Sequence, residues 1–190
     1  MDGLDIRPGE LIVDLGAGSG ALSLALLTVG AEVIAVEADD SWVDELCARR
    51  QSLPFDQRQR FEIAHGGIEQ FIFPSTPFRV VANPPFGMST AVLRLLLDDV
   101  ANGPTRADLI LQREVAEKRV AAIPDTLLSA SWAPWWTFEI VTQIKRTAFR
   151  PVPRVDAAAL RIERRIPPVL PEWLAPNFSS LLRERWHRGP

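Results

Sequence analysis

The feature that most restricts the fold is a set of alternating glycines directly after a short apolar run. The run Leu11-Ile-Val-Asp14 reads as a strand, glycines stand at positions 16, 18 and 20, and residues 21–29 read as a helix. Glycines let the backbone turn tightly and approach a ligand, and the helix that follows begins with unpaired N–H groups. This order predicts a nucleotide-type pocket, although such turns also serve plain helix packing. No Lys-Ser or Lys-Thr pair follows, which excludes a P-loop.

Strand-like and helix-like segments alternate through the next hundred or so residues. Strands are expected at 32–36, 61–64, 78–82 and 108–111, and helices at 42–50, 89–99 and 114–122. Such alternation predicts an α/β fold with a doubly wound, mostly parallel sheet. Glu37 ends the second strand about 20 residues after the glycines, where an acid is placed to accept both ribose hydroxyls. The alternative is an ordinary surface carboxylate.

The last third changes character. Residues 137–145 and 157–164 alternate like strands, and the Arg150-Pro-Val-Pro153 break between them leaves no room for a crossover helix. We therefore expect an antiparallel hairpin at the sheet edge. The prolines at positions 167, 168, 171 and 176 predict an extended segment, ending in a short amphipathic helix near residues 178–186. The expected division is one α/β domain over residues 1–166 and a basic tail over residues 167–190.

Charge is distributed unevenly along the chain. The net charge is −3, but residues 1–70 carry 5 Lys and Arg against 13 Asp and Glu, whereas residues 71–190 carry 16 against 11. From residue 145 onward 10 basic residues face 4 acidic ones. A basic region of this kind suits a phosphate backbone, and a solvated basic face is the equal alternative.

Composition excludes several other classes of protein. Apolar stretches are broken well before the ~18 residues of a membrane span, and the acidic start does not resemble a secretory signal, so a cytoplasmic protein is expected. The lone Cys47 is expected to be half-buried and cannot form an internal disulfide. Trp132, Trp135 and Trp136 are expected in the core rather than in a base-stacking platform. No metal site is expected.

The strongest chemical signal is Asn83-Pro-Pro-Phe86, which ends the fourth expected strand, where open α/β sheets bind ligands. Two prolines fix the backbone, so the Asn83 amide oxygen and the Pro84 carbonyl can both accept hydrogen bonds from an exocyclic amino group. Phe86 can stack on the base. Methyl transfer to such a nitrogen needs no strong base, because the proton leaves after the nitrogen becomes cationic. A proline-stiffened loop is the structural alternative.

These segments together resemble the Erm/KsgA family of rRNA adenine N6-methyltransferases. The matching motifs are Asp14-Leu-Gly-Ala-Gly-Ser-Gly20, Glu37, Asn83-Pro-Pro-Phe86, Leu111-Gln-Arg-Glu-Val-Ala-Glu-Lys-Arg119 and Phe149-Arg-Pro-Val-Pro-Arg-Val-Asp156. The resemblance covers roughly residues 6–166. It implies a Rossmann-like methyltransferase domain, S-adenosylmethionine as methyl donor, and an adenine flipped out of folded rRNA as substrate. The tail would then be a remnant of a helical RNA-binding domain.

The resemblance also assigns roles to individual residues. Cofactor contacts would come from Asp14, Gly16, Ala17, Gly18, Gly20, Glu37, Gly67, Ile68 and Asn83. The substrate amino group would be held by Asn83 and the Pro84 carbonyl, with Phe86 stacked on the adenine. Phe149 would close the other face of the adenine or be a plain core residue. RNA contacts are expected from Lys145, Arg146, Arg150, Arg154, Arg164 and Arg165.

Three departures from the family pattern are visible. The sequence contains no Gln-Asn-Phe-Leu-like segment before the first strand. Gly67 stands where the family usually has an Asp for the cofactor's adenine amino group, so a backbone group or Glu69 would replace it. His65, nearby, is expected to be a loop histidine rather than a catalytic one. The C-terminal helical domain is reduced to about two dozen residues.

Overall similarity favours the Erm branch, whose members modify large-subunit rRNA and confer resistance to macrolide-type antibiotics. The KsgA branch, which modifies small-subunit rRNA, is the near alternative. A DNA or protein amino-methyltransferase would share Asn-Pro-Pro-Phe, and a binding protein could keep the fold without catalysis. A monomer is expected.

Overall fold

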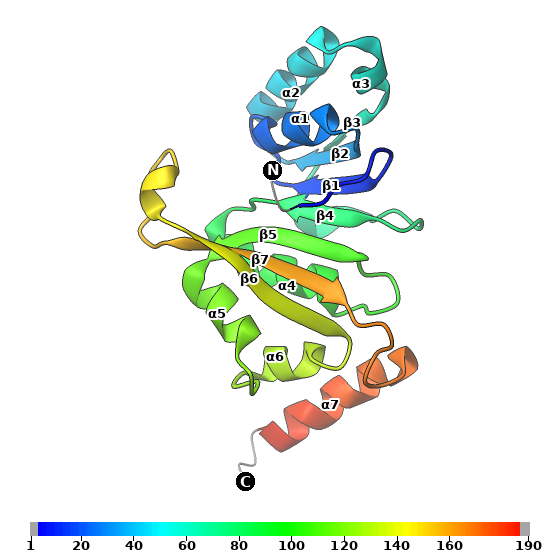
Figure 1. Ribbon diagram of the computed structural model, residues 1–190, viewed down its shortest axis with the longest axis vertical. Coiled ribbons are helices and arrows are strands. Elements are labelled where there is room, and N and C mark those ends of the chain that lie inside the picture. The colour runs from blue at the N-terminus through cyan, green and yellow to red at the C-terminus, as the bar shows by residue number, and fades with distance from the viewer. Residues whose placement is uncertain (1–3, 187–190) are drawn as a thin grey trace.

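The computed structural model describes residues 4–186, which form a seven-stranded sheet with helices on both faces (Figure 1). The strands are β1 (Leu11–Leu15), β2 (Glu32–Glu37), β3 (Phe61–His65), β4 (Arg79–Ala82), β5 (Arg106–Gln112), β6 (Trp136–Ile144) and β7 (Ala157–Arg164). The helices are α1 (Ala21–Thr28), α2 (Asp40–Ser52), α3 (Phe55–Gln59), α4 (Ser89–Leu97), α5 (Arg113–Val120), α6 (Leu127–Trp132) and α7 (Ala175–Trp186). Short 3-10 turns lie at Ile68–Gln70, Phe86–Met88, Arg146–Ala148 and Glu172–Leu174.

The strand order is β3-β2-β1-β4-β5-β7-β6, with β1 to β5 parallel and β7 antiparallel to both of its neighbours. This confirms the mostly parallel, doubly wound sheet with an antiparallel hairpin. In the register, Ala157 pairs with Gln112 on β5 and with Ile144 on β6. Because β7 is reversed, the 145–156 connection that precedes it lies at the same edge as the carboxyl ends of the parallel strands. That connection is the yellow and light orange loop in Figure 1.

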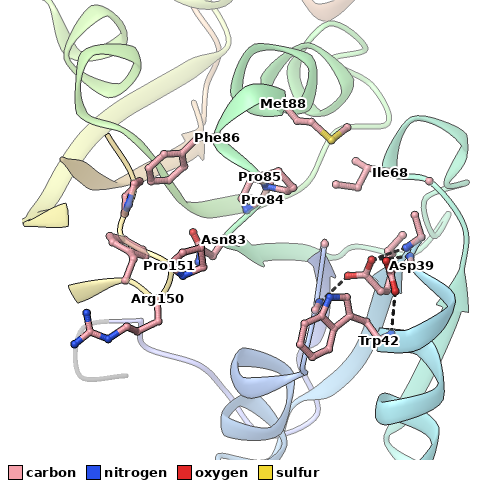
Figure 2. A pocket seen from close by; sticks show the side chains of 18 of the residues that line it. Asp39, Trp42, Ile68, Asn83, Pro84, Pro85, Phe86, Met88, Arg150 and Pro151 are labelled. Carbon is pink, nitrogen blue, oxygen red and sulfur yellow. Dashed lines mark hydrogen bonds between the residues drawn. The ribbon is translucent and has the colours of Figure 1, made fainter. Parts of the chain in front are cut away.

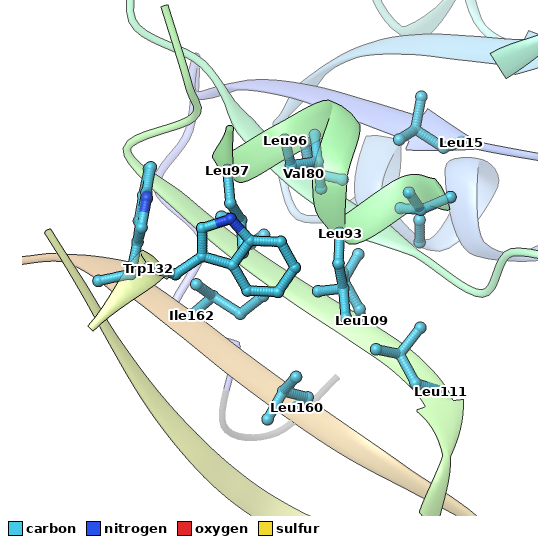
Figure 3. Close-up of a cluster of buried hydrophobic side chains, with 14 of the residues drawn as sticks. Leu15, Val80, Leu93, Leu96, Leu97, Leu109, Leu111, Trp132, Leu160 and Ile162 are labelled. Atoms are coloured by element: carbon cyan, nitrogen blue, oxygen red, sulfur yellow. The ribbon is translucent and has the colours of Figure 1, made fainter. Parts of the chain in front are cut away.

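Two apolar layers hold the helices on the sheet. On one face, α1 and α2 place Leu26, Leu27 and Leu46 against strands β1 to β3. On the other face, α4 to α6 pack on the larger core, part of which is drawn in Figure 3. Most of its leucines and isoleucines come from β5, β7 and α4, and Trp132, Trp135 and Trp136 are at most 2% exposed. The prediction that these tryptophans belong to the core is confirmed.

The described part of the tail packs on this same core. The indole of Trp135 donates a hydrogen bond to the Leu170 carbonyl at 2.8 Å, and its ring meets Phe178 edge-on with centroids 5.6 Å apart. Ala175 in α7 is 7% exposed and belongs to the cluster. The helix expected at 178–186 is present and begins three residues earlier. Residues 187–190 of the expected tail lie outside the described residues.

Two short helices and one side chain differ from expectation. Helices α3 and α6 were not predicted; Pro54 precedes the first, and the Thr126 side chain caps the second by accepting from the Ser129 N–H at 3.2 Å. The expectation that Cys47 is half-buried is wrong, because its side chain is exposed. Helix α2 buries Leu46, and the next residue lies about 100° further around the helix, off that buried face.

A charged cluster stabilises the opposite edge of the sheet. The Asp108 carboxylate, 8% exposed, accepts hydrogen bonds from three guanidinium groups. Arg79 is 1% exposed and lies 2.6 Å from Asp108, Arg106 lies at 2.8 Å, and Arg161 at 3.2 Å. Arg79 also donates to the Leu4 carbonyl, which ties the first described residues to β4. One carboxylate thus compensates one buried and two partly buried guanidinium groups near the amino ends of β4 and β5.

Candidate active site

A cavity of about 870 Å³ opens at the carboxyl ends of β1, β2 and β4 (Figure 2). It has two ends in this view. Asn83, Phe86 and Pro151 lie at one end, whereas Asp39, Trp42 and Ile68 lie at the other. Six of the expected cofactor contacts line the cavity: Gly16, Gly18, Glu37, Gly67, Ile68 and Asn83. Asp14, Ala17 and Gly20 are not part of its lining.

The glycine turn is joined to β2 by hydrogen bonds and lies close to Pro85. The N–H groups of Gly16 and Ala17 both donate to the Val36 carbonyl, at 2.9 and 3.1 Å, which joins the turn to the end of β2. Gly16 has a φ of 76°, and a Cβ there would lie 3.3 Å from the Pro85 ring. A Cβ on Gly18 would meet no atom within 4 Å, so the turn presents open backbone to the cavity.

Asp14, near the end of β1, is buried and hydrogen-bonded to the start of α1. Its carboxylate is 1% exposed and accepts a hydrogen bond of 2.7 Å from the Ser23 hydroxyl at the start of α1. Burial raises the pKa of Asp14 to about 7, although the hydrogen bonds from Ser23 act in the opposite direction. The nearby charge of Glu37 raises this pKa further. Asp14 therefore has a structural role between strand, turn and helix, without facing the cavity.

Glu37 is oriented by the backbone around it. One carboxylate oxygen accepts from the Gly18 N–H at 2.7 Å, and the other accepts from the N–H groups of Ala38 and Asp39 at 2.8 and 2.9 Å. A carboxylate offers about four acceptor positions, so one remains for a ligand hydroxyl. A fixed acidic acceptor beside an open glycine turn is the arrangement that a nucleoside ribose requires. The residues present therefore fit a nucleoside-containing cofactor.

The Asn83-Pro84-Pro85-Phe86 segment leaves β4 and forms the wall at the other end. Pro84 is buried, whereas the Asn83 side chain is exposed to the cavity and takes part in no hydrogen bond among residues 4–186. The Pro85 carbonyl accepts from the Met88 N–H at 2.8 Å, and the Phe86 carbonyl accepts from the Ser89 hydroxyl at 2.8 Å. These bonds fix the segment and leave the Asn83 amide available as an acceptor.

Phe149 lies against Phe86 at the cavity mouth. Their ring centroids are 5.8 Å apart and their planes meet at 73°, an edge-to-face contact. A base held between two rings needs them parallel and about 7 Å apart, twice the contact distance of stacked atoms. Phe149 is therefore a cavity residue rather than a core residue, and a base could stack on both rings only if Phe149 rotates.

The expected RNA-contacting residues fall into two groups. Lys145, Arg146, Arg150 and Arg154 lie exposed in the loop beside the cavity, and their side chains form no ion pair within residues 4–186. Arg164 and Arg165 lie at the opposite edge, at and just after the end of the reversed strand β7. Arg164 pairs with Glu172 at 2.8 Å, and Arg165 donates to the Ala133 carbonyl at 2.8 Å. The structure therefore separates Arg164 and Arg165 from the loop residues, because charge counted along the sequence does not record the reversal of β7.

The sequence reasoning missed several cavity residues, Trp42 among them, and misplaced His65. Trp42, three residues after the Asp39 cap of α2, lines the cavity, and this position in the first helical turn could have indicated it. His65 was expected in a loop, but it is the last residue of β3, where its side chain is exposed and pairs with Asp40 at 3.0 Å. It does not line the cavity. Within the described residues no cluster of His, Cys, Asp and Glu could hold a metal ion. No helix between residues 4 and 186 is long and apolar enough to cross a membrane.

Comparison with known proteins identifies the family. The profile of the family described as "Ribosomal RNA adenine dimethylase" matches residues 1–188. The chain belongs to this family. Among curated dimethylase relatives, the rRNA adenine N-6-methyltransferase of Corynebacterium diphtheriae is 36% identical over 84% of this chain and 60% of its own length. The mycinamicin-resistance protein MyrB of Micromonospora griseorubida is 35% identical over 91% of this chain and 53% of its own.

The fold of this dimethylase-family chain also matches a solved structure. The crystal structure of the 23S rRNA methyltransferase ErmE superposes with a TM-score of 0.80 and 25% identity, over 94% of this chain and 71% of that one. The Rossmann-like methyltransferase fold is thereby confirmed. The chain spans little more than half the length of the curated relatives, so the activity of a whole protein is argued below as a proposal.

Proposed function

We propose that this protein transfers a methyl group from S-adenosylmethionine to N6 of an adenine in large-subunit rRNA, and thereby confers resistance to macrolide-type antibiotics. The observation that carries the proposal is the free Asn83 amide, held by two prolines beside a cavity whose other end fits a nucleoside. Family membership and the likeness to MyrB and ErmE support the substrate. We further infer that it acts as a monomer in the cytoplasm.

The chemistry follows from the two acceptors at the Asn83 end. The bound cofactor supplies an electrophilic methyl group on a positively charged sulfur. The Asn83 amide oxygen and the Pro84 carbonyl accept hydrogen bonds from the two N–H groups of the adenine amino group. This arrangement directs the nitrogen lone pair toward that methyl. The new N–C bond forms as the S–C bond breaks, and the nitrogen then loses one proton to water. Phe86 supplies an apolar face on which the adenine stacks.

Removing the amide acceptor tests the mechanism. Asn83→Ala is expected to abolish transfer of labelled methyl to protein-free 23S rRNA while S-adenosylhomocysteine still binds in calorimetry. Asn177→Ala, an exposed change in α7 far from the cavity, is the matched control and should behave as wild type. An Asn83→Ala protein with normal transfer would refute the mechanism.

The position of the label distinguishes the branches. Primer extension should place it at one adenine of 23S rRNA. Label found only in 16S rRNA would instead support the small-subunit branch. Cofactor binding without label in either RNA would refute rRNA as the substrate.

The exposed loop beside the cavity is proposed to contact the RNA backbone. Changing Lys145, Arg146, Arg150 and Arg154 together to Gln should weaken binding of 23S rRNA fragments. The slope of log affinity against log salt concentration should also become shallower by about 3, if all four side chains neutralise phosphates of single-stranded RNA. The control is the pair Arg183→Gln and Arg185→Gln in the tail. If each charge removed from the tail weakened RNA binding as much as each charge removed from the loop, a site localised at the cavity mouth would be contradicted.

A further inference from the structure

The loop that joins β6 to β7 carries an exposed apolar side chain at the cavity mouth. Figure 1 shows this loop, residues 145–156, projecting from the edge of the sheet. Val152 lies in the loop, lines the cavity and is 49% exposed. Among the exposed large apolar side chains of residues 4–186, only Trp42 also lines the cavity, and it lies at the opposite end. Val152 is therefore the exposed apolar side chain at the end where the substrate adenine is proposed to enter.

The local sequence restricts the backbone at Val152. Pro151 and Pro153 flank it, and each proline ring fixes its own φ near −65°. A residue that precedes proline is restricted to extended backbone, and a β-branched side chain has few rotamers. Within residues 4–186, no hydrogen bond between backbone groups involves residues 150–155, so the stiffness of this segment comes from its covalent structure. A stiff apolar side chain loses little conformational entropy when it contacts a ligand.

Asp156 ties the two ends of the loop to each other and to α5. Its carboxylate accepts from the Arg146 N–H at 3.0 Å and lies 3.7 Å from the Arg113 guanidinium. Its carbonyl accepts from the Arg113 N–H at 3.0 Å. These contacts set where Val152 lies with respect to the cavity.

An arginine stands two residues away on each side of Val152. Arg150 and Arg154 are exposed, and neither side chain forms an ion pair within the described part of the chain. In Figure 2 the Arg150 side chain points away from the cavity. Cations on both sides of an apolar contact match a nucleic-acid strand, in which each base lies between two phosphates. The charges therefore favour RNA as the occupant over an apolar segment of another protein.

We propose that Val152 packs against a base next to the target adenine, in the space that the adenine leaves when it rotates into the cavity. This inference rests on the proposed methylation of rRNA. Extruding a base costs its stacking on its neighbours, and some DNA-binding proteins insert apolar side chains between base steps at such positions. Arg150 and Arg154 hold the phosphates on either side. Val152 is thus a substrate-positioning residue that does not touch the reacting atoms.

Val155 offers a matched control, because it is a valine of the same loop, 45% exposed, outside the cavity lining. The assay is single-turnover transfer of labelled methyl to a 23S rRNA fragment that contains the methylated adenine. Val152→Ala should slow transfer about fivefold, equivalent to about 1 kcal/mol, because two methyl groups no longer cover the base. Val155→Ala should transfer at the wild-type rate, and Val152→Ile should keep most of it. Binding of S-adenosylhomocysteine should be the same in wild type and all three variants.

Removing the neighbouring base from the RNA tests the contact directly. Two further fragments carry an abasic nucleotide on the 5′ or the 3′ side of the adenine. On one of them, wild type and Val152→Ala should transfer methyl at the same rate, because the contact is missing from both complexes. Circular dichroism establishes that each variant is folded.

The outcomes separate this inference from the proposed function. If wild type transfers no methyl to the 23S rRNA fragment, the proposed function fails. If wild type is active and Val152→Ala is as fast as Val155→Ala, Val152 does not position the RNA. A loss that persists on both abasic fragments refutes contact with a neighbouring base. Weaker binding of S-adenosylhomocysteine by Val152→Ala would show that Val152 acts on the cofactor instead.

Discussion

Asp14→Asn should change how the stability of this protein depends on pH. Asp14 is buried beneath the glycine turn, and burial raises its pKa from 3.8 to about 7. Between these pH values the folded protein keeps a proton that the unfolded chain releases. The free energy of unfolding therefore falls as pH rises from about 4 to about 7 and is constant above that. Asn is neutral throughout and still offers Ser23 an acceptor, so the variant lacks this contribution.

The size of the pKa shift of Asp14 sets how much the free energy of unfolding changes with pH. One pH unit corresponds to about 1.4 kcal/mol, so the full contribution is about 4 kcal/mol and the part between pH 5.5 and pH 8 is about 2 kcal/mol. Urea unfolding of both proteins at pH 5.5, 6.5, 7.5 and 8.5 gives the difference directly, because the other titrating groups cancel. Relative to wild type, the Asn variant should gain about 2 kcal/mol over this range. A difference that stays constant across the four pH values would refute a raised pKa for Asp14.

Two further predictions concern packing and charge. Gly20→Ala puts a Cβ 2.5 Å from a Leu46 methyl at a φ of 77° and should lower the free energy of unfolding by about 2–4 kcal/mol in urea. Gly18→Ala has open space around it and should lower this free energy only by the backbone strain of about 1–2 kcal/mol. Equal losses of stability in the two variants would contradict the packing argument. Asp108→Asn leaves three guanidinium groups without their shared carboxylate and should cost about 3–5 kcal/mol, whereas Glu139→Gln, with a side chain 67% exposed, should change stability by less than about 1 kcal/mol. A loss at Asp108 no larger than that at Glu139 would show that the cluster contributes little.

Local signals predicted most of the fold. The glycine turn, the acid at the end of β2 and the Asn83 segment each follow a short apolar strand, and strand ends of a parallel sheet meet at one edge. Their convergence on one cavity could therefore be expected without coordinates. Helix α6 was missed because Thr126 caps only six helical residues, too few to show a helical period.

Properties that depend on orientation were not accessible from the sequence. Arg164 and Arg150 are both basic residues of the C-terminal third, yet the reversed strand β7 separates them by its full length. Trp42 could equally have faced solvent, because the helical period around it is weak: α2 buries only Leu46. Phe149 could be assigned to the cavity only once its contact with Phe86 was known. Each of these depends on which way a side chain points, which composition and spacing do not encode.

The reversal of β7 also determines where another group can be attached to this protein without covering the cavity. The first described residues bond to Arg79 at the amino end of β4, and the chain leaves β7 at that same edge before α7 packs on Trp135. Both described ends thus lie away from the cavity mouth. A surface anchor, an affinity tag or a fluorescent partner attached at either end would leave the opening accessible to a substrate as large as a folded RNA.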